Sequence, residues 1–219
     1  MHHAHRHGHA HHADGPVISF DERARAWDTP ERHRRARVVA EAIAANIPLD
    51  GAWDAVEIGC GTGLLSLQVG PRLRHVLLTD VSRGMLDVAR EHAVHDPERY
   101  TVAEHDLTSA PLAQPVDLAF TAMALHHIAD LTALLTHVRA GLNPGGWVAV
   151  VDIDADPDNT FHPDGFAGHH GIDRDALTSH LRELGFADVT ARTIDTLVRV
   201  KNGQEFEHDV FLATGHLPA

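Results

Sequence analysis

The feature that most constrains the fold is a regular alternation of short apolar runs with stretches of helical periodicity between residues 53 and 153. The apolar runs, each of strand length, are 53–58, 75–80, 100–103, 117–121 and 147–153. The helical stretches that follow some of them are 64–69, 85–92 and 131–140. Strands that alternate with helices form a mostly parallel sheet with helices on both faces. The sequence therefore predicts a doubly wound α/β fold.

The C-terminal part of the chain has a different order of elements. After a predicted helix at 173–184, two alternating strands, 189–200 and 205–214, follow each other directly and are joined by Asn202-Gly203. An Asn-Gly pair between two such strands is typical of a tight antiparallel hairpin. We therefore expect a mostly parallel, seven-stranded sheet that ends in a C-terminal antiparallel hairpin.

The N-terminal part is expected to be helical. Apolar residues recur at helical spacing from 21 to 46, and Pro30 predicts a split into two helices near Thr29. We expect residues 16–50 to form a helical cap on a single domain at 16–219. The histidine-rich residues 1–15 cannot build a core and are expected to be a disordered tail, either native or an affinity tag.

Composition excludes several classes of function. The formal net charge of −13 argues against nucleic acid as a partner, and the basic run at Arg32, Arg34, Arg35 and Arg37 is interpreted as a solvated helix face. A single cysteine, Cys60, excludes an internal disulfide and multi-cysteine zinc sites. No apolar run approaches the roughly 20 residues of a membrane span, and no signal peptide is recognised, so we expect a cytoplasmic protein without membrane contact.

A glycine-rich turn follows the first strand of the alternating region. Glycines at 59, 61 and 63 let the chain turn tightly and let a ligand approach the backbone. The dinucleotide fingerprint would need glycine at position 64, where the chain has Leu64. The acidic Glu57 before the turn suits a ligand with a cationic amino-acid end. The turn therefore favours a nucleotide-like ligand other than NAD.

Two carboxylates are predicted at the same edge of the sheet. Asp80 lies 21 residues after Gly59 at the end of the second strand, where it can accept hydrogen bonds from ribose hydroxyls. Asp106 comes just after the third strand and is placed to accept a hydrogen bond from an exocyclic adenine amine. Because carboxyl ends of parallel strands meet at one edge, these residues and the turn are expected to form one site.

Together these residues resemble the class I S-adenosylmethionine-dependent methyltransferases, especially the small stand-alone members. The resemblance covers roughly Ser19 to Leu217. It includes an N-terminal element at 20–28, a turn at 142–146 before the fifth strand, and the terminal hairpin. It implies a Rossmann-like methyltransferase fold with S-adenosylmethionine as cofactor.

The resemblance also implies roles for individual residues. Asp80 would hold the ribose, Val81 and Met85 would flank the adenosine, and Asp106 with Leu107 would meet the adenine. Glycines 59, 61 and 63 would border the methionine part, and Thr121 and His126 would lie beside its end. The expected cofactor site is therefore Trp27, Glu57, Gly59, Cys60, Gly61, Gly63, Asp80, Val81, Met85, Asp106, Leu107, Thr121 and His126, where Cys60 is a small buried filler of the turn.

The acceptor is expected at the carboxyl ends of the later strands, where residues 155–171 form a long polar loop. Its residues His162 and His169 are the candidate general bases, because a histidine pKa lies near working pH. Phe161, Phe166 and Trp27 are candidates for an apolar wall over the acceptor. A divalent metal held by Asp152, Asp154 and His169 or His170 is a less favoured alternative, and no metal is predicted.

The expected function is transfer of a methyl group to an O, N or C nucleophile of a small-molecule acceptor, with S-adenosylhomocysteine as product. Two alternatives stay open at this point. One is an NAD(P)-dependent oxidoreductase, and the other is a non-catalytic metal-binding protein that uses the histidine-rich segments.

Overall fold

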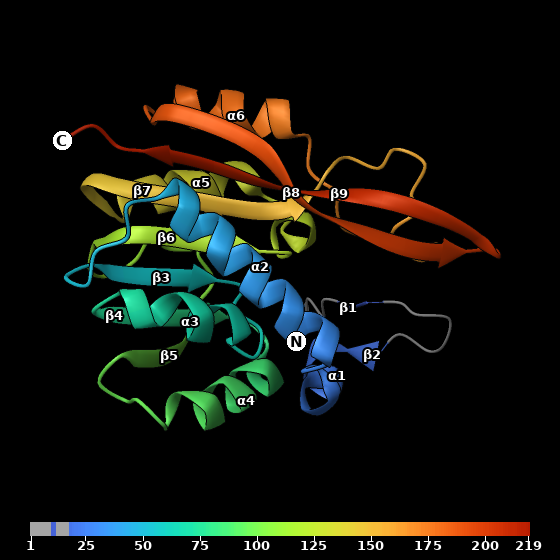
Figure 1. Cartoon of the computed structure of the whole chain (residues 1–219), viewed down its shortest axis with the longest axis horizontal. Coiled ribbons are helices and arrows are strands. Elements are labelled where there is room, and N and C mark those ends of the chain that lie inside the picture. Colours follow the sequence, from blue (N-terminus) through green and yellow to red (C-terminus); the bar gives the residue numbers. More distant parts are fainter. Residues whose placement is uncertain (1–9, 12–17) are drawn as a thin grey trace, which may run out of the picture.

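A seven-stranded sheet forms the centre of the molecule in the computed structural model, which describes residues 10–11 and 18–219 (Figure 1). Its strands are β3 (Asp54–Ile58), β4 (His75–Asp80), β5 (Tyr100–Glu104), β6 (Val116–Ala122), β7 (Leu142–Ile153), β8 (Ala187–Lys201) and β9 (Gln204–His216). The order across the sheet is β5-β4-β3-β6-β7-β9-β8. Strands β3 to β7 pair in parallel, and β9 runs antiparallel to both neighbours. The predicted fold class is thereby confirmed.

Six α-helices and three short 3-10 helices complete the described chain. The α-helices are α1 (Phe20–Arg23), α2 (Pro30–Asn46), α3 (Leu64–Val69), α4 (Arg83–Ala93), α5 (Leu131–Ala140) and α6 (Arg174–Glu183). The 3-10 helices are η1 (Ala24–Ala26), η2 (Gly70–Arg72) and η3 (Leu125–His127), and β1 (Ala10–His11) pairs with β2 (Ile18–Ser19) in a small separate sheet. Residues 1–9 and 12–17, which include most of the expected tail, lie outside the described part of the chain.

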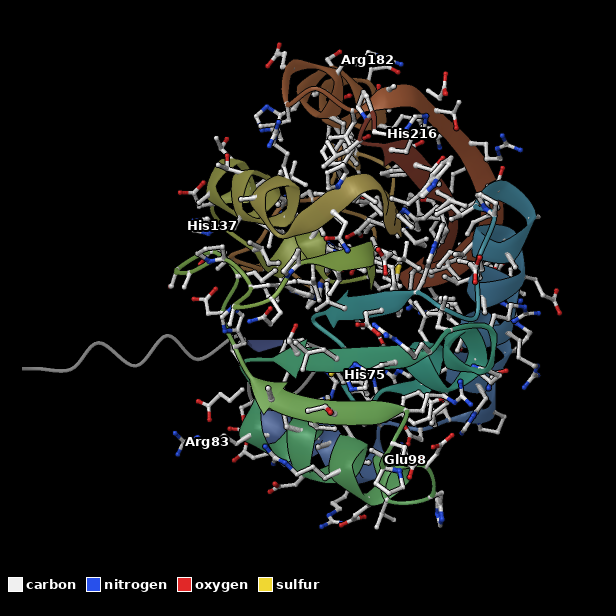
Figure 2. All side chains as sticks on the ribbon, turned by 90° about the vertical axis from the view of Figure 1, so that its left-hand side faces the viewer. His75, Arg83, Glu98, His137, Arg182 and His216 are labelled. Carbon is white, nitrogen blue, oxygen red and sulfur yellow. The ribbon has the colours of Figure 1, made fainter. Side chains whose placement is uncertain are left out.

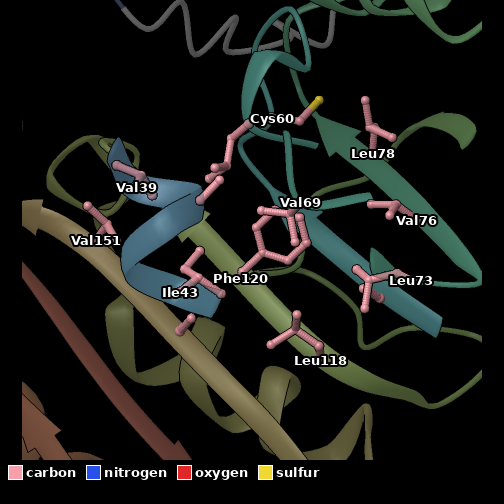
Figure 3. Packing of buried hydrophobic residues seen from close by; sticks show 14 of the residues in the cluster. Val39, Ile43, Cys60, Val69, Leu73, Val76, Leu78, Leu118, Phe120 and Val151 are labelled. Carbon is pink, nitrogen blue, oxygen red and sulfur yellow. The ribbon is translucent and has the colours of Figure 1, made fainter. Parts of the chain in front are cut away.

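Two apolar layers hold the helices against the two faces of the sheet (Figure 2). On one face, α2, α3 and α4 pack with the strands around Phe120, which is fully buried (Figure 3). On the other face, α5 and α6 pack around Phe211. Burial of an aromatic or branched aliphatic side chain stabilises the fold by about 1.5–3 kcal/mol. These layers fix the carboxyl ends of the parallel strands relative to α2.

The start of α2 is set by local chemistry. Thr29 accepts a hydrogen bond from the backbone N–H of Arg32 as the N-cap, and Pro30 occupies the first turn, where no backbone donor is required. The buried residues of α2 are Ala36, Val39, Ala40 and Ile43, which share one helix face. The predicted split between two helical segments is confirmed, and it places the first turns of α2 beside the site described below.

Two details of the sheet concern its C-terminal half. The turn expected at 142–146 is wrong as a separate element: these residues lie within β7, where the pairing with β6 shifts its register between Val116 and Leu118. The hairpin turn is confirmed, with positive φ angles of 54° at Asn202 and 76° at Gly203. Strands β8 and β9 extend well past β7, because β7 pairs only with 210–216 of β9 (Figure 1).

None of the helices in residues 18–219 combines the length and apolar character that crossing a membrane requires.

Candidate functional site

The glycine-rich turn connects β3 to α3 and is built on left-handed backbone. Gly59, Gly61 and Gly63 all have positive φ angles, of 63°, 55° and 82°. A Cβ on Gly59 would lie 2.6 Å from Ala124 Cβ, and one on Gly63 would lie 2.6 Å from Leu78 Cδ2, so both positions also need glycine for packing. At Gly61 a Cβ would instead lie 3.8 Å from Trp27 Nε1, in the space that the turn leaves for a ligand.

Glu57, at the end of β3, is a buried carboxyl group below the turn. Its Oε2 accepts hydrogen bonds from the backbone N–H and the hydroxyl of Ser66. Burial raises the pKa of Glu57 to about 8 despite these hydrogen bonds. A cationic group bound nearby would favour the charged form, which is the property expected of a carboxyl beside a ligand's ammonium group.

Asp80 lies at the end of β4, next to the turn. Its Oδ2 accepts a hydrogen bond of 2.8 Å from the N–H of Gly61, and its Oδ1 accepts one of 2.8 Å from the N–H of Ser82. A carboxylate offers about four acceptor sites and is a group that can accept hydrogen bonds from ribose hydroxyls. The bonds also orient Asp80 and couple it to the glycine-rich turn.

A cavity of about 700 Å³ runs along this edge of the sheet and brings most of the expected cofactor residues together. This volume lies within the range of small-molecule sites, roughly 300–1,000 Å³. The expected residues that line it are Trp27, Glu57, Gly59, Cys60, Gly61, Asp80, Val81, Met85, Asp106 and Leu107. Gly63, Thr121 and His126 do not line it.

Asp106 follows β5, the edge strand of the sheet, and lines the cavity there. Its carboxylate is engaged in its own loop, where it accepts hydrogen bonds from the N–H and hydroxyl of Thr108 and from the hydroxyl of Ser109. Burial acts to raise its pKa, but these hydrogen bonds outweigh it and the pKa is lowered. Leu107 beside it is buried and supplies an apolar surface.

The segment after β6 differs from the expectation. Thr121 is buried without a partner for its hydroxyl in the described structure, and His126 is buried against Asp152, with 2.5 Å between Nδ1 and the carboxylate. The cavity wall is made instead by the neighbouring residues Met123 and His127. Met123 has a φ of 57°, a left-handed conformation that is uncommon for a side chain of this size and is frequent at functional sites.

His162 and His169 lie away from the cavity wall. His162 is buried, and its ring is stacked on Phe166 at a centroid distance of 3.8 Å and an angle of 3°. Burial lowers its pKa to about 3, so it is a weak base at neutral pH. His169 is exposed, and its Nε2 lies 3.0 Å from the carbonyl oxygen of Ile128. Both positions are therefore poor ones for a base acting on a ligand in the cavity.

The buried ring of His162 predicts a specific pH dependence. Its pKa in the folded chain lies below the usual 6.5, so the unfolded chain binds the additional proton. The contribution of the neutral His162 ring to the free energy of unfolding is therefore complete above pH 6.5. It is lost as the pH drops toward 3, by up to about 1.4 kcal/mol per pH unit. We expect His162→Phe to remove this loss, measured by urea unfolding between pH 4 and 7. The exposed His95→Phe should keep it, and a parallel loss in His162→Phe would contradict the assignment.

The loop 155–171 contributes little to the cavity wall. Of its residues only Ala167 lines the cavity. The loop is held instead by the hairpin, where Lys201 Nζ donates to the carbonyl oxygens of Asn159 and His162 and pairs with Asp164. Phe161 and Phe166, the expected apolar wall, are absent from the lining, whereas Trp27 belongs to it.

Sequence reasoning missed several residues of the cavity wall, notably Phe20, Arg32, Arg35, Met123 and His127. The solvated helix face expected for the basic run is wrong for Arg32 and Arg35, which line the cavity. The signal that would have placed them correctly is their spacing relative to the buried Ala36 and Val39, which continues one face of α2.

The residues considered for a metal are engaged elsewhere. Asp152 pairs with His126, and Asp154 forms an ion pair with Arg174. In the described ranges, no group of three or more histidine, cysteine, aspartate or glutamate side chains is arranged to hold a metal ion.

Comparison with known proteins agrees with this geometry. Residues 55–146, from β3 to the register shift in β7, match a family model described as a methyltransferase domain. An uncharacterised methyltransferase of Mycobacterium tuberculosis is 32% identical over 107 residues, which are 49% of this chain and 53% of the relative. One of Schizosaccharomyces pombe is 30% identical over 132 residues, 53% of this chain and 46% of the relative. The chain thus spans about half the length of the curated relatives it matches.

Among solved structures, the N-methyltransferase NodS of Bradyrhizobium japonicum in complex with S-adenosyl-L-homocysteine has the same fold. The TM-score is 0.63 at 19% identity, over 89% of this chain and 91% of that one. At this identity the likeness concerns the fold alone.

Proposed function

Since the chain carries a methyltransferase domain of the class I S-adenosylmethionine-dependent family, we propose that it transfers a methyl group from S-adenosylmethionine to a small-molecule acceptor bound in the same cavity. The observation that carries the proposal is the convergence of Glu57, the glycine-rich turn and Asp80 on one cavity wall. Neither alternative is favoured, because Leu64 breaks the dinucleotide fingerprint and residues 55–146 match a methyltransferase domain.

The cavity residues fit the cofactor. The backbone of Gly61 faces the space between Trp27 and Met85, and a Cβ there would occupy room that the ligand needs. The buried carboxyl of Glu57 suits a cationic amino-acid end. Asp80 would accept from the ribose hydroxyls, and Val81 with Met85 would flank the adenosine. Leu107 would pack on the adenine, and Asp106 would meet its amine. When bound, S-adenosylmethionine supplies a methyl group already activated by its sulfonium.

The chain then has to align the acceptor and keep water out of the cavity. His127 lies on the cavity wall after β6, close in sequence to Ala124, which borders the turn at Gly59. Its ring packs edge-on against Phe20, with 5.4 Å between centroids, and against Phe166, with 5.3 Å. These two aromatic rings hold the imidazole at the cavity wall. We infer that His127, rather than His162 or His169, is the histidine that contacts the acceptor and takes its proton where the acceptor is protonated.

His127→Ala tests this role. We expect turnover to fall by about 100-fold, the usual contribution of a positioned general base, while affinity for S-adenosylhomocysteine changes little. His169→Ala serves as the matched control, because His169 is exposed and lies off the cavity wall. The readout is S-adenosylhomocysteine release at saturating acceptor. Equal activity of His127→Ala and the control would remove His127 from the mechanism.

The proposed function itself is tested by calorimetry with S-adenosylmethionine, S-adenosylhomocysteine and NADH on the full chain. We expect micromolar binding of the first two ligands and no binding of NADH. A methyl-labelled donor is then incubated with a broad panel of small acceptors, and label transfer is followed by mass spectrometry. Binding of NADH alone would overturn the proposal in favour of an oxidoreductase.

A further inference from the structure

The basic residues at the start of α2 divide between solvent and cavity. Arg34 and Arg37 are exposed, whereas Arg32 and Arg35 line the cavity. The two groups differ because α2 turns one face inward, and positions 32 and 35 share that face with the buried positions 36 and 39. Two guanidinium groups therefore border the ligand site of a protein whose formal net charge is −13.

Arg35 has hydrogen-bonding capacity that the described residues do not use. Only 14% of its side chain is exposed, and its Nη2 donates to Glu31 Oε1 at 2.9 Å. Its Nε is buried and has no hydrogen-bond partner in the described part of the chain. Burial lowers the pKa of Arg35, which means that the charged form is poorly compensated at this position. An anionic ligand would supply the missing compensation.

The charged groups around Arg35 are of both signs. The cations are Arg32, on which Arg35 acts, and Arg34 and Arg199 of β8, which act on Arg35. The acidic groups acting on Arg35 are Glu31 and Asp195. Of these, Glu31 is largely exposed, and Asp195 is paired with Arg34. Two guanidinium groups on the cavity wall, one of them with a buried Nε that lacks a partner among the described residues, therefore favour an anion over a neutral or cationic ligand.

The two arginines differ in their position along the cavity. Arg32 lies over the ring of Trp27 at 3.8 Å, and its Nη1 donates to the Trp27 carbonyl oxygen at 2.7 Å. Trp27 in turn borders Gly61 of the turn, so Arg32 is held on the cofactor side. Arg35 lies one helical turn further along α2, towards Val39. Arg35, Val39 and Met123 all line the cavity, and Met123 directly follows β6, the strand end at which the acceptor is expected.

We propose that the methyl acceptor carries an anionic group, a carboxylate or a phosphate, which binds to the guanidinium of Arg35, and that its apolar body lies against Val39 and Met123. Guanidinium groups bind both anions with paired, charge-assisted hydrogen bonds. The proposal rests on the proposed methyltransferase function and names the substrate class for the same cavity.

The test uses the full chain saturated with S-adenosylhomocysteine and three probes of similar size: phenylacetate, phenyl phosphate and the neutral phenylacetamide. Calorimetry gives the affinity of each probe for the wild type, Arg35→Gln, Arg35→Lys and the exposed control Arg37→Gln. We expect at least one anion to bind about tenfold or more tightly than phenylacetamide, as a charge-assisted hydrogen bond implies. The anion with the higher affinity identifies the group.

Arg35→Gln should abolish the preference for the anion, Arg35→Lys should keep part of it, and Arg37→Gln should leave it unchanged. Affinity of each variant for S-adenosylhomocysteine reports whether the fold and the cofactor site are intact. Equal binding of the amide and the anions by the wild type would overturn the proposal, as would absence of binding by all three probes. A tenfold loss of S-adenosylhomocysteine affinity in Arg35→Gln would also overturn it, because Arg35 would then hold the cofactor's own carboxylate.

Failure of the wild type to bind S-adenosylhomocysteine would contradict the proposed function instead. The probes are in that case compared on the chain without cofactor. The preference for an anion and its dependence on Arg35 then decide the proposal independently.

Discussion

Replacement of Asp80 by alanine is expected to weaken the binding of S-adenosylhomocysteine by about 100-fold or more. Two charge-assisted hydrogen bonds to the ribose would be lost, each worth about 1.5–3 kcal/mol. The substitution also removes the acceptor that holds the N–H of Gly61 at 2.8 Å and the N–H of Ser82 at 2.8 Å. The loss therefore combines direct ligand contacts with a less ordered glycine-rich turn.

Calorimetry with S-adenosylhomocysteine measures this effect, and thermal unfolding shows whether the variant is folded. Asp87→Ala is the matched control. Asp87 lies on α4, two residues after Met85 of the cavity wall, but its side chain is exposed and forms a surface ion pair with Arg90. An affinity for Asp80→Ala equal to that of the control would remove Asp80 from the cofactor site.

The second large effect is expected from Gly59→Ala. Alanine at a φ of 63° costs about 1–2 kcal/mol in backbone strain, and its Cβ would lie only 2.6 Å from Ala124 Cβ. Relief of this overlap has to move the turn or the segment after β6, and overpacking of this kind costs about 1–3 kcal/mol more. We expect a total loss of about 3 kcal/mol in the free energy of unfolding, together with weaker cofactor binding.

Gly145→Ala separates the two contributions. Gly145 has a φ of 79°, but a Cβ there meets no atom within 4 Å, so this variant carries the backbone strain alone. Urea unfolding of both variants gives the difference directly. Losses of equal size would show that Ala124 moves aside at no cost in free energy. The close packing of the turn against the segment after β6 would then contribute nothing to stability.

The gathering of the expected cofactor residues at one cavity could be predicted because it follows from local sequence pattern and one topological rule. Glu57 and Asp80 lie at the carboxyl ends of two apolar runs that are recognisable as strands, and Asp106 comes just after a third. Parallel strands bring their carboxyl ends to one edge of the sheet. All three line the cavity. The register shift within β7 was missed, because residues 143–146 have turn composition whether they lie in a loop or in an irregular strand pair.

The acceptor side could not be predicted in the same way. His162 and His169 were chosen because a polar loop with histidines suggests a ligand site, but His162 stacks on Phe166 and His169 is exposed away from the cavity. Nothing in the loop's own sequence says that Lys201 of the hairpin holds it in place. The outcome depended on contacts between segments far apart in the chain.

The sequence by itself determined the order of strands and helices, the glycine-rich turn with its left-handed backbone, and the carboxylates at the strand ends. These features depend on residue type and short-range periodicity. Only the tertiary structure decided which face of α2 turns inward, and with it that Arg32 and Arg35 border the cavity while Arg34 and Arg37 face solvent. The reason is physical: the apolar residues of α2 have to be buried against the sheet, and this packing places the adjacent arginines on the cavity wall.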